Sequence, residues 1–191
     1  MIAGVLLAAG GARRFGSQKL LALVDGEPLV RRSASVLAGA VDKLFVVVGH
    51  EREAVREALA GVPAAIVVNH HWPEGQSTSL RAGVEALPLQ TEAVVVALGD
   101  QPQVDAALIQ ALIGAWRDER RSIVVPLYDG VRGNPVLFAQ EVFAELRAVE
   151  GDVGARGVIE RDRSRVTYLD WQSAAPRDVD TPDDLANLRP E

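Results

Sequence analysis

Short apolar runs alternate with amphipathic segments along the whole chain. The apolar runs are rich in Val and Ala and predict buried β-strands at residues 5–9, 43–48, 64–68, 93–98, 122–125 and 166–169. Helical spacing of apolar residues occupies the segments at 27–37, 51–59, 80–84, 106–116 and 139–149. Strands joined by crossover helices pair in parallel. The pattern therefore predicts a three-layer, Rossmann-like α/β fold with a mostly parallel sheet.

One segment departs from this alternation. Residues 130–138 read as a turn followed by a short strand, with Pro135 near its start. Proline lacks the N–H that a sheet ladder uses, so this strand is expected at an edge or in an antiparallel pair, not in the middle of the sheet. No repeat or change of composition divides the 191 residues. We therefore expect one domain over residues 1–191, with a short antiparallel excursion near residues 130–140.

Composition narrows the class of protein. The net charge of −6 argues against a broad nucleic-acid surface, and the absence of cysteine excludes disulfides, thiolate catalysis and zinc–sulfur sites. No apolar run approaches the ~20 residues that a membrane span needs, and the N-terminus lacks a signal-peptide pattern. These observations predict a cytoplasmic protein without nucleic-acid or membrane partners.

The first loop has the composition of an anion-binding site. The strand at 5–9 runs into small residues, and the loop then brings in Arg13, Arg14 and Lys19. Glycines let backbone N–H groups approach an oxyanion, and Arg and Lys add fixed positive charge. The spacing fits neither a P-loop nor a dinucleotide fingerprint. A plain glycine turn followed by surface cations is the alternative interpretation.

Two aspartates are left without a structural task. Asp100 directly follows the most apolar strand, at the edge where open α/β sheets bind ligands, and Asp105 is better placed to cap the next helix. Near the C-terminus, Thr181 predicts a helix start that accounts for the acids after it, which leaves Asp180 and, less favoured, Asp178. Mg²⁺ takes hard oxygen ligands, typically one or two carboxylates plus phosphate oxygens. Mg²⁺ is therefore the expected cofactor.

Three hydroxyl side chains open the helix after residue 75. Either Ser77 or Thr78 is expected to cap it, and a run that also includes Ser79 exceeds what a cap requires. A helix N-terminus favours sugar or phosphate oxygens. Together with the first loop and the aspartates, this set suits phosphoryl or nucleotidyl transfer, which depends mainly on positioning and charge neutralisation. Hydrolases with a Ser–His–Asp or Cys–His set are disfavoured.

Several motifs resemble those of one enzyme family. LAAG followed by RFG and Lys19 resembles the signature loop of nucleotidyltransferases. GQSTSLRAG, GDQP, RGNPVLF, GDVGAR and DVDTPDDL follow in the order found in molybdenum cofactor cytidylyltransferases and their close relatives. The departures are small: Ala12 replaces a Ser or Gly, and Gln76 and Gln103 stand where apolar residues are common.

The resemblance implies transfer of CMP from CTP to the phosphate of molybdenum-bearing molybdopterin, with release of pyrophosphate and with a molybdoenzyme or its chaperone as protein partner. It assigns Arg14 and Lys19 to the β- and γ-phosphates and Asp100 and Asp180 to Mg²⁺, with Arg14, Lys19 and Asp100 as catalytic residues. The nucleotide would be bound by Leu7, Ala8, Ala9, Gly10, Gly11, Arg14, Lys19 and Ser79. The pterin would be bound by Asn134, Asp152 and Arg156.

Other functions stay open from the sequence. The same chemistry could use GTP or another nucleotide and a different phosphate acceptor, because spacing does not show which base is read. A non-catalytic nucleotide-binding protein is a second alternative, although such a protein would not need Lys19 and Asp100. A Rossmann dehydrogenase is the third, and the broken glycine fingerprint disfavours it.

Overall fold

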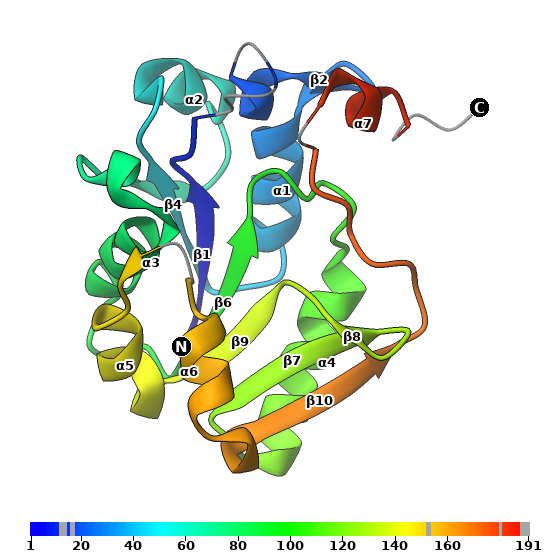
Figure 1. Cartoon of the computed structure of the whole chain (residues 1–191). Helices are drawn as coiled ribbons and strands as arrows, with labels where there is room; N and C mark the ends of the chain where they lie inside the picture. Colours follow the sequence, from blue (N-terminus) through cyan, green and yellow to red (C-terminus); the bar gives the residue numbers. More distant parts are fainter. Residues whose placement is uncertain (12–14, 16–17, 152–153, 180, 188–191) are drawn as a thin grey trace.

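One eight-stranded sheet forms the centre of the protein. The computed structural model describes residues 1–11, 15, 18–151, 154–179 and 181–187. The strands are β1 (Ile2–Ala8), β4 (Lys43–Val48), β5 (Ala64–Val68), β6 (Ala93–Leu98), β7 (Ile123–Tyr128), β8 (Val131–Arg132), β9 (Val136–Ala139) and β10 (Val166–Trp171). Their order is β10-β7-β9-β6-β1-β4-β5, with β8 beside β7 (Figure 1). β1 pairs in parallel with both β4 and β6, which confirms the predicted mostly parallel sheet.

The antiparallel excursion is confirmed, but its strand is not at an edge. β9 lies between β6 and β7 and is antiparallel to both, and all four of its residues are buried. The ladder with β6 begins at Val136, which pairs with Val96, so Pro135 stands just outside it. The missing N–H of the proline therefore costs no ladder hydrogen bond, which is why the strand is tolerated in the middle of the sheet.

Helices cover both faces of the sheet (Figure 1). One face packs against α1 (Leu29–Ala38), α2 (Arg52–Ala58) and α4 (Ala106–Glu119), and the other against α3 (Gln76–Glu85), α5 (Phe143–Arg147) and α6 (Arg156–Arg161). The remaining elements are the hairpin of β2 (Leu23–Val24) and β3 (Glu27–Pro28), the helix α7 (Pro182–Ala186), and 3₁₀ turns at Lys19–Leu21, Trp72–Glu74, Gln140–Val142 and Arg163–Arg165. No helix within the described ranges is long and apolar enough to cross a membrane.

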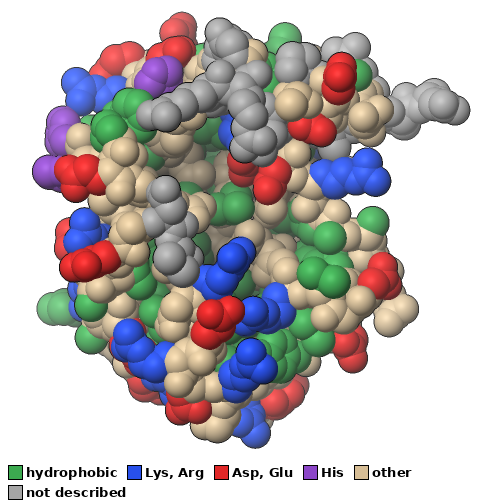
Figure 2. All heavy atoms as spheres, viewed as in Figure 1, with side chains coloured by type: hydrophobic (Ala, Val, Ile, Leu, Met, Phe, Trp, Pro, Cys, Tyr) green, Lys and Arg blue, Asp and Glu red, His purple; other side chains and the backbone are tan. Residues whose placement is uncertain are grey.

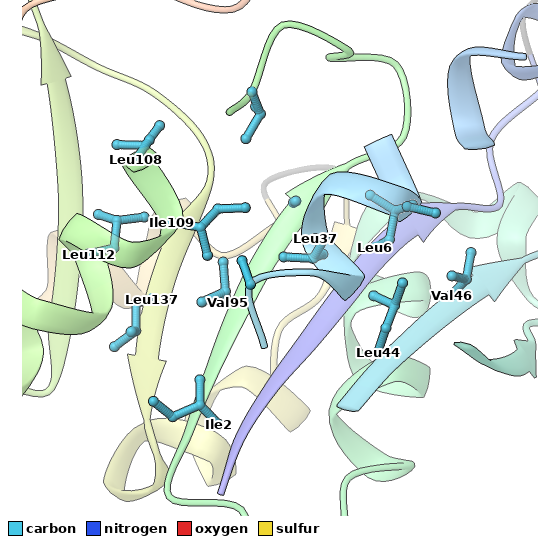
Figure 3. Close-up of a cluster of buried hydrophobic side chains, with 14 of the residues drawn as sticks. Ile2, Leu6, Leu37, Leu44, Val46, Val95, Leu108, Ile109, Leu112 and Leu137 are labelled. Atoms are coloured by element: carbon cyan, nitrogen blue, oxygen red, sulfur yellow. The ribbon is translucent and has the colours of Figure 1, made fainter. Parts of the chain in front are cut away.

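The core has a separate apolar cluster on each face. Figure 3 shows part of the first, in which Leu37 of α1 and Ile109 of α4 lie over Leu6 and Val95 of the sheet. The second cluster places α3, α5 and α6 against the opposite sides of the same strands. A third, small cluster contains Val24, Leu29 and Val179, with Phe15 and Leu185 packed against it. It joins the first loop, the hairpin and the C-terminal segment.

Two of the three predicted helix caps are confirmed. Asp105 accepts a hydrogen bond from Leu108 N at the start of α4, and Thr181 and Asp184 form a reciprocal capping box on α7. The prediction that Ser77 or Thr78 caps α3 is wrong, because the N-cap residue is Gly75 and no side chain caps it. Ser77 and Thr78 instead belong to the first turn and are buried.

Candidate nucleotide-binding site

The carboxyl ends of four neighbouring strands meet at one edge of the sheet. Pairing of Leu7 with both Val47 and Leu98 aligns β1 with β4 and β6, and β5 continues the row beyond β4. The residues that follow these strands are Ala9-Gly10, Gly49-His50, Asn69 and Gly99-Asp100. Open α/β sheets bind their ligands at this edge. The predicted first loop and Asp100 are thus neighbours in the fold.

Close packing fixes the beginning of the first loop. His50 N donates to Ala9 O at 3.0 Å. A Cβ atom at Gly49 would lie 2.7 Å from the Trp72 side chain and 2.8 Å from Ala9 O, so only glycine fits there. Gly10 and Gly11 are exposed, and no heavy atom lies within 4 Å of a Cβ built on Gly10. The loop therefore presents open backbone on a rigid base, as an oxyanion site requires.

Gln18 is a site residue that the sequence did not reveal. Its side chain is only 3% exposed, and Nε2 donates to Gly10 O at 3.4 Å and to His50 O at 3.2 Å. The amide thereby ties the glycine loop to the end of β4. A glutamine before a lysine reads as an ordinary surface pair, because the acceptors that bury it come from another strand.

Lys19 and Asp100 form the charged centre of the site. Lys19 Nζ lies 2.6 Å from Asp100 Oδ2, across 81 residues of sequence, and the two side chains are 16% and 19% exposed. The structure thus joins the predicted phosphate-binding cation to the predicted metal-binding carboxylate. Arg14, the second predicted cation, and Asp180, the second predicted metal ligand, lie outside the described residues.

The donor set suits a metal ion that arrives with a nucleotide. Within the described part of the chain, no three His, Asp or Glu side chains group into a metal site. Asp100 is a hard carboxylate at the ligand edge of the sheet, and Mg²⁺ commonly takes one or two carboxylates and completes its coordination with phosphate oxygens and water. The carboxylate of Asp100 therefore suits a metal that is shared with a triphosphate.

Asn69 organises the hydroxyl groups at the start of α3. Its Nδ2 donates to Thr78 Oγ1 at 2.8 Å and to Ser79 Oγ at 3.0 Å, and its Oδ1 accepts from His71 N. Ser79, the predicted nucleotide contact, is 5% exposed. A hydroxyl that accepts one hydrogen bond, as that of Ser79 does from Asn69, can also donate one. Asn69 followed an apolar strand in the sequence, and that position was the only signal that could have found it.

A pocket adjoins the charged centre on the α3 and α6 side of the sheet. Its volume is about 390 Å³, and its walls combine apolar side chains of β6, β7 and β9 with polar and charged residues of β8 and α6. Leu7, Asn134 and Arg156, three of the predicted site residues, line it together with Gln76 and other residues. Leu98 also lines it, two residues before Asp100. Asp152, the remaining predicted pterin contact, lies outside the described residues.

Charge at the pocket rim is mainly positive. Arg132 Nη2 lies 2.9 Å from Glu160 Oε1, and this hydrogen bond, helped by the charge of Arg156, holds the pKa of Glu160 below its usual range. Figure 2 shows several basic side chains, with acidic ones between them, on the surface below the hollow. Nearby, burial raises the pKa of the Tyr128 phenol, so its hydroxyl stays protonated and donates to Asn134 O at 2.7 Å. The rim therefore suits an anionic ligand.

Comparison with known proteins gives the family of this chain. The sequence profile of the MobA-like NTP transferase domain matches residues 4–166. The chain belongs to this family. It is 31% identical to the nicotine blue oxidoreductase of Paenarthrobacter nicotinovorans, over 98% of this chain and 96% of that one. It is 27% identical to the purine catabolism protein PucB of Bacillus subtilis, over 97% and 95% of the two chains.

Solved structures of similar proteins share the fold of this member of the MobA-like family. Rv0371c from Mycobacterium tuberculosis superposes with a TM-score of 0.85 at 31% identity, over 98% of this chain and 96% of that one. Its complex with manganese gives 0.83 at 32% identity, over 98% and 97%. A nucleotidyl transferase from Methanothermobacter, at 24% identity and a TM-score of 0.79 over 99% and 96%, shares the fold. The predicted nucleotidyltransferase class and its Rossmann-like fold are confirmed.

Proposed function

We propose that this protein transfers CMP from CTP to the terminal phosphate of molybdenum-bearing molybdopterin and releases pyrophosphate. The observation that carries the proposal is the Lys19–Asp100 pair, 2.6 Å apart at the carboxyl edge of the sheet. It supplies a phosphate-binding cation and a metal-binding carboxylate beside a pocket lined by Asn134 and Arg156. Nucleotidyl transfer needs this combination of positioning and charge neutralisation.

Each group has a part in the chemistry. Lys19 and Arg14 bind the β- and γ-phosphates and stabilise the charge of the leaving pyrophosphate. Asp100 and Asp180 would hold Mg²⁺, and the bound ion would supply positive charge that stabilises the α-phosphate during transfer. With metal and triphosphate bound, Lys19 would pair with a phosphate oxygen in place of Asp100. The Lys19–Asp100 ion pair holds the two side chains side by side, where their ligands would meet.

The acceptor supplies its own nucleophile. A phosphate monoester has a second pKa near ~6 and is largely dianionic at neutral pH, so its oxygen attacks without a general base. The apolar walls of the pocket, which include Leu80 and Phe138, suit the flat face of a pterin. Arg156 and the neighbouring Arg132 suit its anionic groups.

The choice of CTP rests on the resemblance of GQSTSLRAG and the motifs after it to cytidylyltransferases. The backbone from Leu7 to Gly11, with Ser79 held by Asn69, would contact base and ribose. We further propose that the reaction takes place in the cytoplasm. A molybdoenzyme or its chaperone, which the same resemblance implies as protein partner, would receive the product.

Guanylyl transfer is the second candidate. The observation in its favour is a 30% identity to the probable molybdenum cofactor guanylyltransferase of Bacillus cytotoxicus, over 72% of this chain and 67% of that one. Both candidates use the same phosphate and metal chemistry, and they differ in the base that is read.

Calorimetric binding of CTP, GTP, ATP and UTP, each with and without Mg²⁺, tests the proposal. We expect tightest binding of CTP, strengthened by Mg²⁺, and loss of that strengthening in the Asp100→Asn variant. Tightest binding of GTP would move the function to guanylyl transfer. NADH and NADPH belong in the panel because one relative is named an oxidoreductase. Binding of these cofactors and of no triphosphate would overturn the proposal.

A further inference from the structure

The segment at 177–179 is fastened to the loop that carries Asp100. Three hydrogen bonds make the connection: Val179 N donates to Asp100 O (3.2 Å), Gln101 Nε2 to Asp178 Oδ1 (2.8 Å), and Arg177 N to Gln103 Oε1 (3.0 Å). The residues joined are about 75 positions apart in the sequence. Asp180, the second metal ligand of our proposal, is the next residue along the chain.

Gln101 is the buried member of these contacts. It is 7% exposed, whereas Gln103 is exposed. Among the residues that the structure describes, the Gln101 side-chain oxygen has no hydrogen-bond partner. A buried oxygen without a hydrogen bond is energetically unfavourable. The Gln101 amide group must therefore be held in its orientation by another contact. The amide nitrogen that bonds Asp178 is the contact that sets this orientation.

The same segment also reaches the first loop. Val179 is fully buried beside Val24 and Leu29, and Phe15 of the first loop packs against this third cluster. A shift of the segment would therefore disturb two contacts of the site: the hydrogen bond to the Asp100 backbone and the packing of the loop proposed to bind the triphosphate.

We propose that Gln101 is a positioning residue for the divalent cation that accompanies the nucleotide. By holding Asp178, Gln101 fixes the segment at 177–179 against the Asp100 loop, and this contact sets the affinity of the site for the cation. This inference rests on the proposed function. It assigns to Gln101 a role that neither touches substrate nor reacts, and it predicts that metal affinity falls when the Gln101 amide nitrogen is lost.

Two matched substitutions separate this role from a simple charge effect. Gln101→Glu replaces the donor nitrogen by an oxygen that faces Asp178 at 2.8 Å. Gln103→Glu makes the same chemical change two residues away but keeps the acceptor oxygen used by Arg177 N. Added negative charge alone would strengthen cation binding in both variants. Loss of positioning weakens it in Gln101→Glu only.

The measurement is electron paramagnetic resonance of free Mn²⁺, titrated with protein in the presence of CTP and, separately, of GTP. Disturbing groups that orient a ligating carboxylate typically weakens metal binding by about 10–100-fold, which is the effect we expect for Gln101→Glu. Gln103→Glu should stay within about threefold of the wild type, as an exposed charge does. Gln101→Met, which removes the donor without adding charge, should also bind Mn²⁺ more weakly.

A double variant supplies the rescue. In Gln101→Glu with Asp178→Asn, the new amide can donate to the new carboxylate, so Mn²⁺ affinity should return most of the way to the wild-type value. Thermal unfolding of every variant shows that the folded state is being compared. Wild-type Mn²⁺ affinity in both Gln101→Glu and Gln101→Met would overturn the inference and leave the proposed function standing. Weakened and rescued Mn²⁺ binding without transfer to molybdopterin would uphold the inference and overturn the proposed function.

Discussion

Replacing Lys19 by Met removes one charge from the centre of the site and keeps an unbranched side chain that is one atom shorter. Lys19 Nζ lies 2.6 Å from Asp100 Oδ2, and both side chains are less than one-fifth exposed. If Lys19 stabilises the leaving pyrophosphate, its loss should lower kcat by roughly 10²–10³-fold, the usual effect of removing one donor aimed at developing charge. That factor corresponds to about 2.7–4 kcal/mol of transition-state stabilisation.

Stability should change much less than activity. A hydrogen bond to a charged group contributes about 1.5–3 kcal/mol, and the partial exposure of this pair favours the lower end. At about 2–4 °C per kcal/mol for a chain of this size, the melting temperature should fall by about 3–6 °C. Lys43, the other lysine of the chain, starts β4 at the opposite edge of the sheet and provides the matched control.

The assay is pyrophosphate release from CTP with molybdopterin as acceptor, measured well below the melting temperature and accompanied by urea unfolding of each variant. We expect Lys43→Met to keep its activity. If Lys19→Met also retained activity within about threefold, Lys19 would be a structural partner of Asp100 only, and the assignment to the phosphates would be refuted.

Two further predictions concern stability. Gly83→Ala would place a Cβ atom 2.5 Å from a Val5 methyl group, so overpacking should outweigh the gain in helix propensity and lower the free energy of unfolding by about 1–2 kcal/mol. In Gly114→Ala, in α4, the new Cβ atom meets nothing within 4 Å, and the free energy of unfolding should rise by about 0.5–1 kcal/mol. Urea unfolding of both variants checks that the two changes have opposite signs. Glu145 has a pKa below the ordinary 4.5, chiefly because Arg165 donates hydrogen bonds to it. The ionised Glu145 therefore stabilises the fold above pH 4.5, and this stabilisation is lost as the pH falls through the lowered pKa. Glu145→Gln should weaken the pH dependence of the melting temperature between about pH 3 and 5. An unchanged dependence would contradict this role of the Glu145–Arg165 pair.

Local pattern was sufficient for most of the fold. Strands β4, β5 and β6 have the predicted limits, because each is a compact, almost unbroken apolar run. β4 and β6 are buried inside the sheet, and β5 is a half-buried edge strand. The central place of β9 was not predictable in this way. It depends on the alignment of Val136 with Val96, which leaves Pro135 outside the ladder, and that alignment is a property of the whole sheet.

For the site, residue types at the ends of strands were informative, and contacts between distant segments were not. Asp100 was found because it follows an apolar strand and has no local partner to explain it. Its pairing with Lys19, the Gln18 bridge and the Gln101–Asp178 contact each join residues that the fold brings together from different elements. The prediction that Ser77 or Thr78 caps α3 was wrong. The Asn69 side chain that binds Thr78 comes from the end of β5, nine residues earlier, and this contact cannot be seen in the local pattern.

Transfer of label tests the central claim most directly. Protein, Mg²⁺ and molybdenum-bearing molybdopterin are incubated with CTP or GTP labelled at the α-phosphate, and the labelled dinucleotide and the released pyrophosphate are both measured, with Asp100→Asn as control. The account predicts label in the pterin product from CTP, equal amounts of pyrophosphate, and neither product with Asp100→Asn. Transfer from GTP alone would contradict the choice of nucleotide, and pyrophosphate or dinucleotide at wild-type rates with Asp100→Asn would contradict the mechanism.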